Sequence, residues 1–240
     1  GDSYMACVGE RLIEEVEVEI GGQRIDKHNY TWMNAWNQLT MPAGKQAAFN
    51  TMVGASQTGK EAASAAQKVY VPLVFWFNRN PGLALPLIAL QYHEVKINVQ
   101  FNTATVVAAQ VAANAAGNLT LGNCCVFCDY IFLDTDERRR FAQVSHEYLI
   151  EQVQYSNALK IGNTGGQVEL RFNHPVKDVV WHRAATAAAG DTTDVGNCLL
   201  QLNGHDRFRK RDGSYFRIVQ RYQHHSGAAP TTATGSRGAH

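Results

Sequence analysis

The stretch from Val69 to Phe101 constrains the fold of this chain most, because it joins a long apolar run to a strict two-residue alternation. Four apolar residues alternate with Lys96, Asn98 and Gln100, namely Val95, Ile97, Val99 and Phe101. Successive side chains of a strand point to opposite faces, so this part predicts a strand with one face on a core and one in water. The run 69–77 is too apolar to alternate and predicts a strand covered on both faces. The break at 78–81 excludes a membrane span, which needs ~20 uninterrupted apolar residues.

A second alternation predicts a hairpin. Val16, Val18 and Ile20 alternate with glutamates, and Gly21-Gly22 follows at once. Glycine at both central positions permits the positive φ values of a type I′ turn, so residues 23–28 should return antiparallel.

Further short strands follow along the chain. We expect them at Val126–Leu133, Tyr148–Tyr155, Val168–Phe172, Val176–Trp181, Cys198–Leu202 and Tyr215–Val219. The connection 29–68 should be partly helical, with a short helix at 62–68, and 102–123 reads as a low-complexity surface loop. Many short strands with scattered helix indicate an all-β sandwich or barrel.

One helix has a clear start signal. Asp134 stands at the N-cap with Glu137 at the third helical position, a capping-box arrangement, and Asp136 and Arg140 are spaced for an i,i+4 ion pair. The helix separates two similar units. In each, an alternating strand is followed by a glycine turn, an arginine and a large apolar residue, at 16–25 and at 198–208. This repeat suggests two tandem sandwiches with a boundary near 133–145.

Composition limits the number of domains and the classes of partner, but it does not indicate a function. The chain has 240 residues, 45% hydrophobic and 18% charged, which is ordinary for a folded protein of one large or two normal domains. A formal net charge of +1 gives no general reason to expect nucleic acid or an anionic membrane as partner. No signal pattern opens the chain, and 14–20 already reads as a strand in the middle of a domain, so we expect an N-terminally truncated piece of a longer protein.

The residues that could carry chemistry fit structural roles better. Cys124, Cys125 and Cys128 have the C-x-x-C spacing of a zinc half-site, but no second pair supports it, and we expect buried, reduced thiols there. The pairs at 93–94 and 146–147, each His-Glu, are expected to be solvated strand ends rather than metal ligands.

The basic run 207–211 is expected to be a solvated turn, which disfavours nucleic-acid contact. Sequons make Asn29 and Asn118 candidates for N-glycosylation, and Asn118, in the expected surface loop, is the better of the two. No nucleophile elbow, phosphate loop or dinucleotide fingerprint occurs, so we expect no enzyme and no cofactor.

Five blocks in order resemble one family. They are LIEEVEVEIGGQRIDKH, VPLVFWFNRNPGLALPLIALQYHEVKINVQF, DYIFLDTDERRRFAQVSHEYLIEQVQ, FNHPVKDVVW and LQLNGHDRF with GSYF. Together they cover most of 12–223 and look like the major capsid protein of nucleocytoplasmic large DNA viruses, in the algal-virus and mimivirus-like branch.

The resemblance implies a tandem (double) jelly roll. The first jelly roll would occupy 1–133 without its N-terminal strand, 134–145 would be the connecting helix, and 146–240 would be the N-terminal part of a truncated second jelly roll. Residues 227–240 would be a disordered or non-family tail. A homotrimer would form pseudo-hexagonal capsomers in an icosahedral virion shell assembled in the host cytoplasm, with minor capsid proteins as further partners. A jelly-roll carbohydrate-binding or cupin-like metal-binding module is the alternative.

Overall fold

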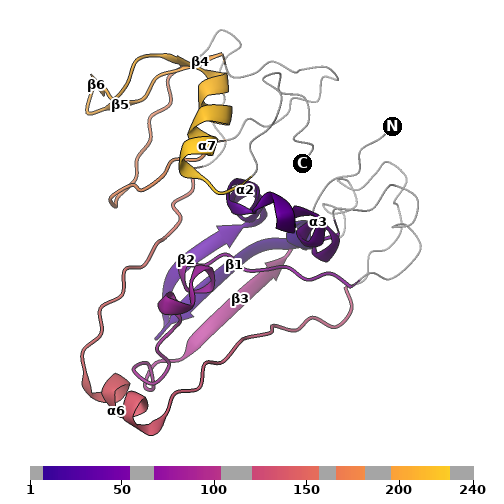
Figure 1. Cartoon of the computed structure of the whole chain (residues 1–240), viewed down its shortest axis with the longest axis vertical. Helices are drawn as coiled ribbons and strands as arrows, with labels where there is room; N and C mark the ends of the chain where they lie inside the picture. Colours follow the sequence, from indigo (N-terminus) through magenta and orange to yellow (C-terminus); the bar gives the residue numbers. More distant parts are fainter. Residues whose placement is uncertain (1–7, 55–67, 104–120, 157–165, 182–195, 228–240) are drawn as a thin grey trace.

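A computed structural model describes residues 8–54, 68–103, 121–156, 166–181 and 196–227. Its main sheet has three antiparallel strands, β1 (Ile13–Ile20), β2 (Gln23–Asn29) and β3 (Val95–Phe101), in the order β2-β1-β3 (Figure 1). The short helix α1 (Val8–Leu12) leads into β1. The predicted alternation of faces is confirmed in β1 and, as far as Val99, in β3, whereas Phe101 at the end of β3 is 41% exposed.

The predicted hairpin is confirmed. Gly21 and Gly22 have φ values of +60° and +81°, which the right-handed twist of a two-residue hairpin requires. The pairing contains one irregularity: Val18 faces Asp26 and Glu19 faces Arg24, so Ile25 has no partner in β1. Ile25 is therefore the extra residue of a β-bulge.

The core lies on one face of this sheet. Val16 and Val18 are fully buried, together with Met33, Phe75 and Trp76. Burying large apolar side chains against a sheet is the main source of stability for such a unit.

The expected strand at 69–77 is wrong. Residues 68–75 have no strand hydrogen bonding and lie across the core face, and a short helix, α4 (Trp76–Arg79), begins where the strand was expected to end. The apolar run reflects its burial on the sheet, since periodicity cannot distinguish a buried strand from other buried chain. The 3₁₀ turn η1 (Pro81–Leu83) follows.

The connection after β2 is helical, as expected. It holds α2 (Tyr30–Thr40) and α3 (Ala43–Met52). Asn29 is the N-cap of α2, where its Oδ1 accepts a hydrogen bond of 2.8 Å from the amide of Trp32. The short helix expected at 62–68 lies outside the described residues apart from Lys68, which is not helical.

The helix α6 (Thr135–Gln143) confirms the predicted start signal. Oδ1 of Asp134 accepts a 2.8 Å hydrogen bond from the amide of Glu137. The expected pair of Asp136 with Arg140 is wrong: Asp136 instead lies 3.7 Å from Arg139. Residues three and four apart are both neighbours on a helix, so spacing alone does not choose between them.

Most strands expected after residue 121 are also wrong for this structure. Residues 126–133, 148–155, 168–172 and 176–181 have no strand hydrogen bonding. The segment 198–202 gives only two two-residue strands, β4 (Asn197–Cys198) and β5 (Gln201–Leu202). These pair with β7 (Arg211–Asp212) and β6 (His205–Asp206), respectively.

Residues 215–219 are helical rather than extended: they lie in η2 (Tyr215–Gln220), which is followed directly by α7 (Arg221–His224). A sequence pattern marks which side chains prefer burial, but a strand also needs a neighbouring backbone to bond with. Phe132 and Leu149, which the pattern placed in strands, are 93% and 83% exposed. No helix in the described ranges is long and apolar enough to cross a membrane.

Candidate functional site: a polar junction between the two halves of the chain

Charged and polar side chains join the first half of the chain, 8–103, to the second half, 121–227. We call the set Asp26, Arg79, Glu151, Val153 and Lys177 the junction. Arg79 of α4 pairs with the Glu151 carboxylate, which also binds the ammonium group of Lys177. One carboxylate thus holds two cations that are far apart in the sequence.

Arg79 is also held in place by contacts within the first half of the chain. Its guanidinium lies 3.9 Å from the centre of the Trp36 ring, and its Nε donates a 3.0 Å hydrogen bond to the carbonyl of Val74. Burial lowers the pKa of Arg79, while the nearby carboxylates of Glu151 and Asp26 oppose that change. The ion pair is therefore better shielded from water than an ordinary surface pair.

Asp26 makes the second contact between the halves. Its buried carboxylate accepts hydrogen bonds through Oδ1 from the amides of Lys27, at 2.9 Å, and Val153, at 3.0 Å. Its Oδ2 lies 2.7 Å from Nε2 of His28, close enough for an ion pair when His28 is protonated but without hydrogen-bond angles. His28 is also buried and stacks on Phe75 at 4.4 Å.

The C-terminal end of α2 forms another contact with the second half. Three of its last carbonyls accept hydrogen bonds from the second half. The Gln38 carbonyl accepts from the Arg221 guanidinium. The Leu39 carbonyl accepts from the Gly227 amide at 2.7 Å, and the Thr40 carbonyl from the Ser226 hydroxyl at 2.6 Å. The last carbonyls of a helix lack intrahelical donors, so this contact satisfies them. Burial lowers the pKa of Arg221.

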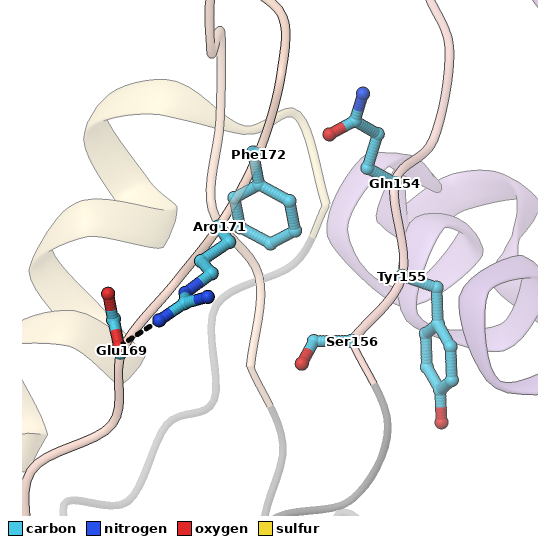
Figure 2. Close-up of a pocket in the computed structure, with 6 residues that line it drawn as sticks. All are labelled: Gln154, Tyr155, Ser156, Glu169, Arg171 and Phe172. Carbon is cyan, nitrogen blue, oxygen red and sulfur yellow. Dashed lines mark hydrogen bonds and ion pairs between the residues drawn. The ribbon is translucent and has the colours of Figure 1, made fainter.

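A shallow hollow opens between residues 154–156 and 169–172 (Figure 2). Glu169 and Arg171 form an ion pair of 3.0 Å in its lining, which also includes Gln154, Tyr155, Ser156 and Phe172. The Glu169 carboxylate is thus paired with the Arg171 guanidinium rather than left without a charged partner.

The cysteine prediction is partly wrong. Cys124, Cys125 and Cys128 are exposed rather than buried, because 121–133 is not part of a strand ladder. In the described segments no group of three or more His, Cys, Asp or Glu side chains is arranged to hold a metal ion.

The His-Glu pairs lie apart from the junction. His93 and Glu94 are exposed just before β3, and Glu94 pairs with Lys96 at 3.1 Å. His146 follows α6, where its Nε2 contacts the Phe141 carbonyl at 2.9 Å. Apart from the half-buried Phe208, the basic run 207–211 is exposed around β6 and β7, as expected.

The two glycosylation candidates have different surroundings. The Asn29 side chain is half-buried and caps α2, whereas Asn118 lies outside the described residues. Glycosylation at either position stays a prediction.

Sequence reasoning missed the junction. The available signal was Asp26 and His28 at alternating positions of β2, in register with the core-facing Val18 and Val16. Polar residues at core positions of a strand indicate a buried polar contact, but not its partner. Spacing alone could not pair Val153 with Asp26 or Glu151 with Arg79.

Two family models match: "Major capsid protein N-terminus" over residues 2–134 and "Large eukaryotic DNA virus major capsid protein" over residues 137–236. The chain belongs to the family of major capsid proteins of large eukaryotic DNA viruses. The resemblance found in the sequence is confirmed.

Individual relatives agree. The chain is 50% identical to the major capsid protein of Pyramimonas orientalis virus over 93% of this chain and 56% of that protein. It is 38% identical to the major capsid protein of Paramecium bursaria Chlorella virus 1, over 92% of this chain and 59% of that protein. A solved structure described as a quasi-atomic model of the PBCV-1 virus capsid is similar with a TM-score of 0.71 and 35% identity, over 95% of this chain and 64% of that one. The chain thus spans just over half to about two thirds of these relatives.

Proposed function

We propose that this chain is part of a structural subunit of a viral capsid, built as a tandem jelly roll with α6 between the two units. Its likeness to the PBCV-1 capsid chain, with a TM-score of 0.71 over 95% of its length, carries this proposal. The two family models, which end at residue 134 and begin at 137, support a division at the start of α6.

The subunit acts by geometry rather than by chemistry, without a cofactor. Three copies associate through large apolar interfaces into a pseudo-hexagonal capsomer, and weaker contacts between capsomers, and with minor capsid proteins, close an icosahedral shell. The subunits assemble in the host cytoplasm and remain in the virion. Exposed apolar side chains such as Phe127, at 77%, and Phe132, at 93%, support this, because large exposed apolar surface marks a region that is covered on assembly.

The test is expression of the complete reading frame that carries this sequence. Size exclusion with light scattering should give trimers, and negative-stain images should show pseudo-hexagonal particles. Monomers alone over the whole range of protein concentrations tested would contradict the proposal.

Metal analysis of the same sample distinguishes the capsid role from the alternative of a metal-binding module. Stoichiometric zinc, iron or manganese in the purified protein would favour the cupin-like metal-binding module. A metal-free trimer supports the structural role.

A further inference from the structure

The outer edge of β2 has an unusual cover. In the order β2-β1-β3, β2 is an edge strand, and within the described residues no other strand pairs with its outer side. Free strand edges readily pair with another chain, and proteins commonly protect them. The residues beside this edge are 151–153 of the second half, and this segment has no strand pairing of its own.

The contact is made at the β-bulge. Ile25 has no partner in β1, and its carbonyl accepts a hydrogen bond from the side-chain amide of Gln152. The next residue, Asp26, accepts the amide hydrogen of Val153 at 3.0 Å. Two consecutive residues of the segment thus contact two consecutive residues at the irregular position of the edge.

An ion pair fixes the position of the segment along the edge. Glu151, directly before Gln152, is bound by Arg79, which the Trp36 ring and the Val74 carbonyl hold in place. A shift of the segment by one residue would separate Glu151 from Arg79 and Val153 from Asp26 together. The contacts therefore select one register.

We propose that the bulge at Ile25 and Asp26 is a docking notch, and that Glu151–Val153 is an edge guard that prevents β2 from pairing with a second copy of this chain. Only one of the two hydrogen bonds at the notch uses a backbone amide of the guard, so the cover is not a ladder strand. A guard held in this way protects the edge of a free subunit while remaining displaceable. The proposal concerns the subunit before assembly and does not depend on the trimer.

The test compares two matched double variants of the 240-residue chain. Glu151→Gln with Gln152→Ala removes the ion pair and the bond to the bulge. Glu169→Gln with Gln167→Ala makes the same chemical changes at exposed positions, where Glu169 pairs with exposed Arg171. Far-UV circular dichroism checks that both variants keep their secondary structure.

Hydrogen exchange gives the first result. In the guard variant, amides in 23–29 and 151–154 should exchange about tenfold faster, since contacts that held them closed are lost. Amides of β1 that bond to β3 should be unchanged, as should every amide in the control. Equal exchange in the two variants would overturn the guard.

Sedimentation gives the second result. The guard variant should form dimers as its concentration rises, while the control should keep the association state of the parent chain at every concentration. A guard variant that associates no more than the control would overturn the role against a second copy. If the double variant does not fold, the single variant Gln152→Ala, which keeps the ion pair, is used instead. It should still exchange the amides of 24–26 faster than the parent chain does. Unchanged exchange rates at 24–26 would overturn the notch.

Discussion

At the scale of single residues, the ring of Phe75, in the segment that covers the sheet, is fully buried and stacked on His28. Phe75→Ala should destabilise the chain by ~3–5 kcal/mol, from lost transfer energy and the cavity left behind. That is a large part of the roughly 5–15 kcal/mol available to a domain. Urea unfolding followed by circular dichroism measures the change.

The control for Phe75 is Phe132→Ala. Phe132 is 93% exposed, so its truncation should change stability by no more than about 0.5 kcal/mol. Equal losses in the two variants would mean that Phe132 is covered in solution.

Asp212 gives a pH dependence at the same scale. Hydrogen bonds from the side chain and the amide of Ser214 lower the pKa of Asp212 below its ordinary value of 3.8. A lowered folded-state pKa stabilises the turn above pH 3.8, and this contribution is lost as pH falls through the folded value. An NMR titration should show this, and Ser214→Ala should raise the Asp212 pKa partway back. An unchanged pKa in that variant would assign the shift to the amide alone.

At the scale of elements, α6 depends on its own residues. It has nine residues, and isolated helices of that length are marginal. Asp134→Ala removes the N-cap acceptor and should cost about 1 kcal/mol, seen as faster hydrogen exchange in 135–143. Asp134→Asn keeps an acceptor oxygen and should restore protection. Equal exchange in both variants would show that tertiary contacts hold α6.

The elements also show how far sequence reasoning reaches. The hairpin and α6 were predictable because Gly21-Gly22 and Asp134 act through bonds to residues close in sequence. For the run 69–77, burial was predicted correctly at Val74, Phe75 and Trp76 but not at Tyr70, which is 46% exposed, and the strand was wrong, because chain can also be buried by lying across a sheet.

At the scale of the whole molecule, the C-terminal end of α2 tests the association of the two halves. A Cβ on Gly227 would lie 2.5 Å from the carbonyl oxygens of Gln38 and Leu39, closer than real Cβ atoms come. Gly227→Ala should therefore release 221–227 and speed hydrogen exchange there.

Gly122→Ala is the matched control for Gly227, because its Cβ would meet open space. It should leave exchange at 221–227 unchanged. Protection that survives Gly227→Ala would mean that Arg221 and Ser226 hold the segment without Gly227.

The sequence by itself determined the family, the β1–β2 hairpin, β3 and the capped helix, because each depends on local patterns or on ordered blocks of residues. Tertiary structure alone decided which apolar runs became strands, since a strand needs a partner backbone that no local pattern specifies. It also decided the junction: Asp26 meets Val153, and Arg79 meets Glu151, across more than seventy residues of intervening chain in each case. Such pairs arise only when the fold brings distant segments together.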